Sequence, residues 1–102
     1  MTRPVALITG AGIGIGAATA RAFGRAGHHV VVTDVLEAEG EAVAAQVRDA
    51  GGSAEFRPLD VRSTEACDAV VAAVEAARGG VDVVVANAGI ARKLPLDGLT
   101  DA

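Results

Sequence analysis

The chain has 102 residues, about the size of one small domain, and 51% of them are hydrophobic, which is enough for a packed core. The net charge of −4 and the lack of any Lys/Arg cluster argue against a nucleic-acid-binding protein. One cysteine cannot form an internal disulfide, and the first apolar run is too short for a secretion signal or a membrane span, so we expect a cytoplasmic protein without a membrane partner.

The predicted elements begin with a strand and a helix that flank a glycine-rich turn. Residues 5–8 form a continuous apolar run, which is typical of a strand buried on both faces of a parallel sheet. Gly27 stands where a helix commonly ends. The residues that recur at helical spacing before it are Ile15, Thr19, Ala22, Phe23 and Ala26.

A second strand and a second helix follow. Residues 30–33 form another apolar run, which Asp34 closes, and a helix is predicted over residues 37–50. Glutamates in its first turns complement the helix dipole, and two glycines end it. Its narrow apolar face consists of Val43, Val47 and Ala50.

The last predicted elements are a strand, a helix and a strand. Residues 54–59 form the third strand, and Pro58 places it at a sheet edge because proline cannot donate to a ladder. Ser63 or Thr64 can cap the next helix, and residues 81–86 form a fourth strand. The apolar face of that helix consists of Cys67, Val70, Val71 and Val74.

This alternation predicts an α/β fold, namely part of a Rossmann-type doubly wound parallel sheet with strand order 3-2-1-4. That order puts the strand with Pro58 at one edge and leaves the apolar fourth strand uncovered at the other. We therefore expect residues 1–102 to be the N-terminal part of a single dinucleotide-binding domain, without a second domain.

The glycine-rich turn is the predicted ligand site. Residues 9–16 read Thr-Gly-Ala-Gly-Ile-Gly-Ile-Gly, and a pyrophosphate can reach the N–H groups at a helix N-terminus only where side chains are absent. Asp34 lies 20 residues after Gly14, where its carboxylate can accept hydrogen bonds from the ribose hydroxyls of an adenosine. The alternative is a tight turn that binds no ligand.

Together these motifs resemble the first part of the short-chain dehydrogenase/reductase family. The family's Thr-Gly-x-x-x-Gly-x-Gly pattern matches residues 9–16, its acid after the second strand matches Asp34, and its Asp-Val matches Asp60-Val61. Its Asn-Asn-Ala-Gly matches residues 86–89, with alanine in place of the first asparagine. The resemblance implies an NAD(P)-dependent oxidoreductase, homo-oligomeric when complete, that transfers a hydride between NAD(H) and a small alcohol or carbonyl substrate.

The resemblance also implies which residues contact the cofactor, with Asp60-Val61 against the adenine. Asp34 would repel the 2′-phosphate of NADP, and Val35 and Ile13 supply no counter-charge, so we expect a preference for NAD. The expected cofactor-binding residues are Gly10, Gly12, Ile13, Gly14, Ile15, Gly16, Asp34, Val35, Asp60, Val61, Asn87, Ala88 and Gly89.

Catalytic residues are not expected in this chain. The resemblance implies a Tyr-x-x-x-Lys pair and a serine, whereas the chain has no tyrosine and a single lysine, Lys93, so we expect it to be inactive alone. His28 and His29 precede the second strand, at the opposite end of the sheet from the glycine turn. We interpret them as an exposed loop with no catalytic or metal-binding role, Cys67 as a packed hydrophobe, and Asp82 as a residue without an assigned role.

Two alternative functions remain open. Methyltransferases that use S-adenosylmethionine share the glycine turn and the acid after the second strand, but they usually carry an acidic residue where this chain has Thr9. A non-catalytic nucleotide-binding module would need to pair its apolar fourth strand with another chain, and it predicts a defined oligomer.

Overall fold

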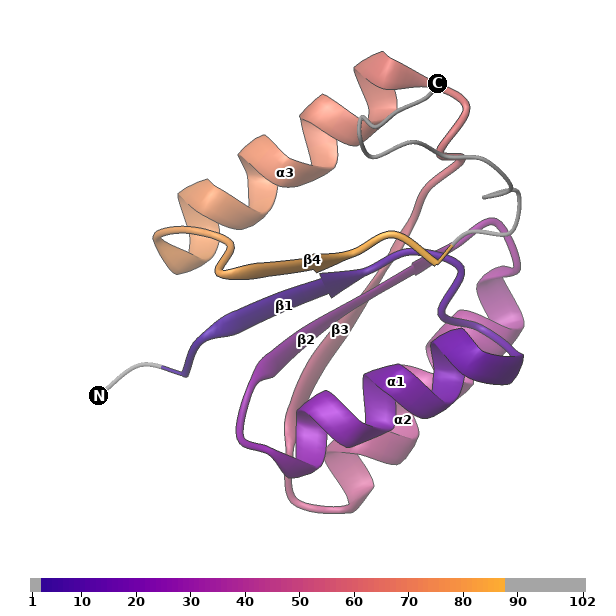
Figure 1. Cartoon of the computed structure of the whole chain (residues 1–102), viewed down its shortest axis with the longest axis vertical. Helices are drawn as coiled ribbons and strands as arrows, with labels where there is room; N and C mark the ends of the chain where they lie inside the picture. The colour runs from indigo at the N-terminus through magenta and orange to yellow at the C-terminus, as the bar shows by residue number, and fades with distance from the viewer. Residues whose placement is uncertain (1–2, 88–102) are drawn as a thin grey trace.

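Four parallel strands form one twisted sheet at the centre of the molecule (Figure 1). The computed structural model describes residues 3–87. The strand order is β3-β2-β1-β4, which confirms the predicted order and places the strand that contains Pro58 at an edge. The strands are β1 (Val5–Ile8), β2 (His29–Asp34), β3 (Ser53–Pro58) and β4 (Val83–Val85).

Three helices cover the sheet on its two faces. The helices α1 (Gly14–Arg25) and α2 (Glu37–Asp49) lie side by side on one face, and α3 (Thr64–Arg78) lies on the other (Figure 1). The molecule is therefore the predicted α/β fold of the Rossmann type.

The two central strands are buried on both faces, as their continuous apolar runs predict. Alternate side chains point to opposite faces of the sheet. Val30 and Val32 pack with α1 and α2, while Val31 packs with Val74 of α3. The central strands thus carry both halves of the core and hold the carboxyl ends of β1 and β2 in place.

The helix α1 forms where it was predicted, but most of the residues that recur at helical spacing do not lie on its buried face. Ile15 is 77% exposed and Ala22 and Ala26 are also exposed, whereas the buried residues of this helix are all small. The physical reason is close packing, since a Cβ atom on Gly24 would lie only 2.6 Å from Cγ1 of Val47 in α2. The buried residues of α1 are Gly16, Ala17, Ala20 and Gly24.

The helix α2 follows its predicted face more closely. Val43 and Val47 are buried as predicted, but Ala50 is the exposed C-cap residue. Gly40 is buried instead, because the ring of Phe56 on β3 occupies the space that a side chain at this position would need. Both helices on this face therefore approach their neighbours through glycines.

The helix α3 begins and ends as expected. The Ser63 hydroxyl accepts a hydrogen bond from the backbone N–H of Ala66 at 3.1 Å, which identifies Ser63 as the cap. Gly79 adopts a left-handed conformation, with φ of 88°, at the other end. Val74 is the fully buried residue of this helix, while Cys67, Val70 and Val71 are half-buried.

The prediction of an exposed histidine loop is wrong for His29. This residue begins β2 and is 1% exposed. Its Nδ1 lies 2.6 Å from the hydroxyl of Ser53, and its Nε2 lies 2.8 Å from a carboxylate oxygen of Glu55, both on β3. The imidazole can be buried because both of its nitrogens have partners on the next strand.

Asp82 also has a role that its sequence position does not reveal. Its carboxylate accepts a hydrogen bond from the backbone N–H of Val5 at 2.7 Å, and its own N–H donates to the carbonyl of Val5 at 2.9 Å. The side chain thus takes the place of a strand carbonyl, and β4 begins at Val83 rather than at the predicted residue 81. Asp82 fastens the beginning of β4 to β1.

Candidate functional site

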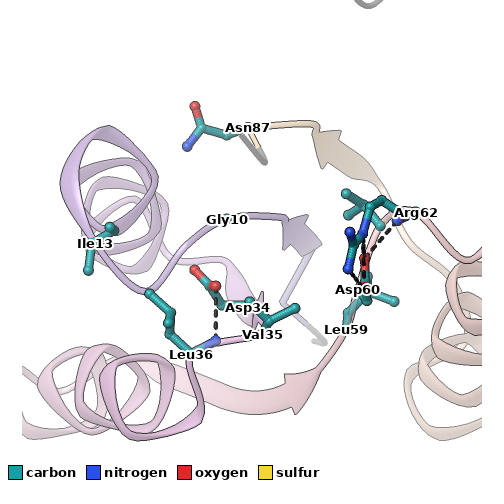
Figure 2. Close-up of a pocket in the computed structure, with 10 residues that line it drawn as sticks. Gly10, Ile13, Asp34, Val35, Leu36, Leu59, Asp60, Arg62 and Asn87 are labelled. Atoms are coloured by element: carbon teal, nitrogen blue, oxygen red, sulfur yellow. Dashed lines mark hydrogen bonds and ion pairs between the residues drawn. The ribbon is translucent and has the colours of Figure 1, made fainter. Parts of the chain in front are cut away.

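A hollow of about 480 Å³ lies where the carboxyl ends of the strands meet (Figure 2). Ligands of doubly wound sheets bind at this end of the strands. Of the eleven predicted cofactor-binding residues that lie within residues 3–87, seven line it. The lining residues are Gly10, Ile13, Asp34, Val35, Leu36, Leu59, Asp60, Val61, Arg62 and Asn87.

The glycine turn forms one wall of the hollow and leads into α1. Gly14, the first residue of α1, adopts a left-handed conformation with φ of 59°, which favours glycine. A Cβ atom on Gly16 would overlap the backbone carbonyl of Gly10 and lie 2.6 Å from Nδ2 of Asn87. A Cβ atom on Gly12 would lie 2.9 Å from Oδ2 of Asp34. The glycines are therefore required by backbone conformation and by the close approach of neighbouring groups.

The N-terminus of α1 is suited to an anion. Its N-cap residue, Ile13, makes no side-chain hydrogen bond to the first turn, and the first turn carries no acidic residue. The first N–H groups of a helix have no partner within the helix, and the helix dipole favours negative charge there. A phosphate group is the natural partner for such a helix end when no side chain blocks it.

Asp34 lies at the base of the hollow and is held in one orientation. The residue is 8% exposed, its Oδ2 accepts the backbone N–H of Gly12 at 2.8 Å, and its Oδ1 accepts the N–H of Leu36 at 3.1 Å. A carboxylate has about four acceptor positions, so these two bonds leave acceptor capacity on both oxygens. The arrangement can receive hydroxyl donors such as those of a ribose.

The end of β4 is joined to the glycine turn through Thr9. The N–H of Asn87 donates to the Thr9 hydroxyl at 2.8 Å, and the Thr9 N–H donates to the carbonyl of Val85 at 3.0 Å. These bonds place Asn87 at the rim of the hollow (Figure 2). Ala88 and Gly89 lie outside the described residues.

Two side chains at the mouth of the hollow are apolar and exposed. Ile13 is 58% exposed and Val35 is 59% exposed. Ile15 does not line the hollow, so any contribution it makes to a ligand would come from its backbone. Leu36 and Leu59 add apolar walls that the sequence motifs did not single out.

Arg62 is the charged residue of the hollow that no sequence motif indicated. Its Nε lies 3.0 Å from Oδ1 of Asp60 and its Nη2 lies 2.7 Å from Oδ2, while its backbone N–H also donates to Oδ1 at 3.0 Å. The hydrogen bonds from the Arg62 side chain, and then that from its backbone, lower the pKa of Asp60 to about 2. The available signal was a cation two residues after an acid in the turn that follows β3.

The described residues, 3–87, contain neither a cluster of His, Cys, Asp and Glu suited to a metal ion nor a helix long and apolar enough to cross a membrane. A parallel 3-2-1-4 sheet with a glycine turn at the end of β1 and an acid at the end of β2 defines a Rossmann-type nucleotide-binding fold. The chain belongs to the short-chain dehydrogenase family, because the sequence model described as "short chain dehydrogenase" matches residues 4–102.

Individual relatives agree with this assignment. Galactitol 2-dehydrogenase from Agrobacterium fabrum is 40% identical over 101 residues, which cover 99% of this chain and 38% of that protein. A hydroxysteroid dehydrogenase from Escherichia coli superposes with a TM-score of 0.79 at 33% identity, over 83% of this chain and 36% of that one. A metagenomic short-chain oxidoreductase in complex with NADP superposes with a TM-score of 0.78 at 39% identity. The match covers 82% of this chain and 38% of that one.

The chain thus spans well under half the length of the relatives that it matches. Family membership argues against the methyltransferase alternative, because S-adenosylmethionine enzymes do not account for the match over residues 4–102.

Proposed function

We propose that this chain binds the adenosine and pyrophosphate parts of NAD(H) in the hollow. We further propose that the complete protein transfers a hydride between NAD(H) and a small alcohol or carbonyl substrate. The observation that carries the proposal is the buried carboxylate of Asp34, oriented by two backbone N–H groups and facing the hollow beside the glycine turn.

The pyrophosphate would lie against the N-terminus of α1. Ile13 and Ile15 would contribute only backbone N–H groups there, since their side chains are exposed and apolar. The absence of acidic side chains in the first turn supports this placement, because an anion meets no like charge at the helix end. The glycine residues that would permit the approach are Gly10, Gly12, Gly14 and Gly16.

The adenosine would occupy the rest of the hollow. Asp34 would accept the ribose hydroxyls, and the apolar side chains of Val35 and Val61 would flank the adenine. Asp60 would lie against the adenine, as the family resemblance implies. Asn87 would contact the cofactor from the end of β4, and contacts from Ala88 and Gly89 stay a prediction.

We propose NAD(H) rather than NADP(H) as the preferred cofactor. Two unit charges about 4 Å apart near a protein surface repel by roughly 4 kcal/mol, so a 2′-phosphate beside Asp34 would be strongly disfavoured without a counter-charge. Ile13 and Val35 provide none, and the guanidinium of Arg62 is already paired with Asp60. One solved relative is in complex with NADP, so family membership by itself does not select between the two cofactors.

Titration calorimetry with NADH and NADPH tests this proposal. We expect NADH to bind at least about tenfold more tightly, since even a partly screened repulsion of about 1.4 kcal/mol gives that ratio. Equal or tighter binding of NADPH would refute the preference, and a failure to bind either dinucleotide would refute the proposed function itself.

When the cofactor is bound, its nicotinamide would donate the hydride in the reduced form or accept it in the oxidised form. Residues 1–102 contain no Tyr-x-x-x-Lys pair, so this chain would hold and orient the cofactor while other parts of the complete protein act on the substrate. That residues 1–102 form the N-terminal part of a single domain stays a prediction. A cytoplasmic location and a homo-oligomeric state remain predictions.

A non-catalytic nucleotide-binding module is the second candidate. It is favoured only by β4, which has one strand neighbour among the described residues and whose Val84 is 61% exposed. An exposed apolar edge strand can pair with a second chain. Size-exclusion chromatography with light scattering, run together with an assay for NAD(H)-linked turnover of alcohols, distinguishes a defined inactive oligomer from the proposed enzyme.

A further inference from the structure

The pair formed by Asp60 and Arg62 stands at the side of the hollow opposite Ile13 and the glycine turn (Figure 2). The guanidinium and the carboxylate meet through two parallel contacts, at 3.0 Å and 2.7 Å. Such fork-like pairs fix geometry as well as charge. The Arg62 side chain is 86% exposed and that of Asp60 is 41% exposed, so the pair lies within reach of a ligand in the hollow.

The two oxygens of Asp60 are not used equally. Oδ1 accepts both the backbone N–H and the Nε–H of Arg62, each at 3.0 Å, which fills its acceptor capacity. Oδ2 accepts one short bond from Nη2 at 2.7 Å and has only a long contact with Nε at 3.3 Å. One further strong donor can therefore be accepted at Oδ2 without breaking the pair.

The charge state of the carboxyl group decides what that donor can be. An ionised carboxylate is only an acceptor, whereas a protonated carboxyl group can also donate. The hydrogen bonds from Arg62 lower the pKa of Asp60 to about 2, so the group is ionised at the neutral pH of a binding measurement. Adenine offers an N–H donor at its six position, whereas hypoxanthine offers a carbonyl oxygen, which the carboxylate repels.

We propose that Arg62 is a positioning residue that orients Asp60 as an acceptor for the adenine amino group, and so makes the hollow discriminate against six-oxo purines. The inference rests on the proposed function, because it requires a dinucleotide in the hollow. The inference assigns base selectivity to Arg62, which lies outside the Asp60-Val61 motif. The proposed role of Asp34 is different, because it accepts hydrogen bonds from the ribose hydroxyls.

The test compares NAD⁺ with nicotinamide hypoxanthine dinucleotide by titration calorimetry on the complete protein. We expect the unaltered protein to prefer NAD⁺ by about tenfold, the usual worth of a hydrogen bond to a charged group in a partly exposed site. Arg62→Ala should lower this ratio to about twofold or less, mainly by weakening NAD⁺ binding, because Asp60 then loses its orientation. Asp60→Asn should abolish the preference, since the amide can rotate to donate to the carbonyl oxygen.

Two further variants separate positioning from general damage. Arg62→Lys keeps the charge but cannot form the two-point contact. Its preference for NAD⁺ should therefore lie between that of Arg62→Ala and that of the unaltered protein. Arg78→Ala removes an exposed arginine at the end of α3, outside the hollow, and should leave the ratio unchanged.

The ratio is informative because a structural defect would weaken both dinucleotides alike. Equal losses in Arg62→Ala, an unchanged ratio in that variant, or tighter NAD⁺ binding would each overturn the inference while leaving the proposed function intact. If the unaltered protein bound neither dinucleotide, the proposed function would fail and the inference with it.

Discussion

Polar side chains are buried at both ends of the sheet, but their hydrogen-bond partners differ between the two ends. At the carboxyl end, Asp34 accepts hydrogen bonds from backbone N–H groups and keeps acceptor capacity toward a hollow of about 480 Å³. At the amino end, both nitrogens of His29 are engaged by Ser53 and Glu55. A buried polar group with remaining capacity beside a hollow indicates a binding site, whereas one whose partners all lie on the next strand indicates structure.

The largest expected effect comes from adding a single methyl group at the carboxyl end. Gly16→Ala would place a Cβ atom against the backbone carbonyl of Gly10, which cannot move aside as a flexible side chain would. We expect a loss of at least about 2–3 kcal/mol in the free energy of unfolding, measured by urea denaturation, and no detectable binding of NADH.

The control for this variant lies on the same helix. Ala18→Ser alters an exposed residue of α1 and should change the free energy of unfolding by no more than about 0.5 kcal/mol. Normal stability of Gly16→Ala would show that the turn can yield, and the requirement for glycine at this position would then be wrong.

The next largest effect tests the comparison between the carboxyl end and the amino end of the sheet. Asp34→Asn should weaken NADH binding about 30-fold, since it removes the charge that receives the ribose hydroxyls. His29→Asn, at the other end of the same strand, should leave the affinity within about twofold but lower the free energy of unfolding by about 1–2 kcal/mol, because Ser53 and Glu55 lose a partner. Similar losses of affinity in both variants would contradict the division into a binding end and a structural end.

A smaller effect is expected from adding charge at the mouth of the hollow. Val35→Arg supplies a cation where a 2′-phosphate would lie, and it should raise the affinity for NADPH about three- to tenfold while NADH binding stays within about twofold. Ala22→Arg adds the same charge on the exposed side of α1 and serves as the matched control. Calorimetry with both cofactors measures the change, and an equal gain in the two variants would point to net charge rather than to position.

The smallest expected effect is a pH dependence at the amino end. Burial by itself raises the pKa of Glu55, but the hydrogen bonds with His29 and Arg57 outweigh it and leave the pKa below the usual 4.5. A lowered folded-state pKa means that this contribution to stability is present above pH 4.5 and is lost as the pH falls through the folded-state value. The group is partly exposed, so we expect a change below about 1 kcal/mol.

Urea denaturation between about pH 6 and pH 3 measures this last effect, with Glu55→Gln as the control, because that variant cannot titrate at this position. The difference in stability between the unaltered protein and Glu55→Gln should shrink as the pH falls. A difference that grows on acidification would show that the sign is wrong.

Much of the site could be predicted because its residues follow directly from strand ends. The run at residues 5–8 predicted β1, and the glycine turn had to follow it at the carboxyl end of the sheet. Asp34 could be placed for the same reason, since it closes β2. The link from Asp60 to Arg62 escaped prediction, because nothing in a turn sequence shows whether two nearby opposite charges meet each other or the solvent.

The sequence by itself determined the order of the elements, the parallel α/β fold and the position of the glycine turn, because hydrophobic periodicity and glycine placement are local properties of the chain. Only the tertiary structure decided which face of α1 is buried, since a helix that approaches its neighbours through Gly16 and Gly24 leaves no room for the larger Ile15. It also decided that Asp34 receives the N–H of Gly12 and that His29 receives partners from β3. These contacts join residues more than twenty positions apart, and only packing brings such residues together.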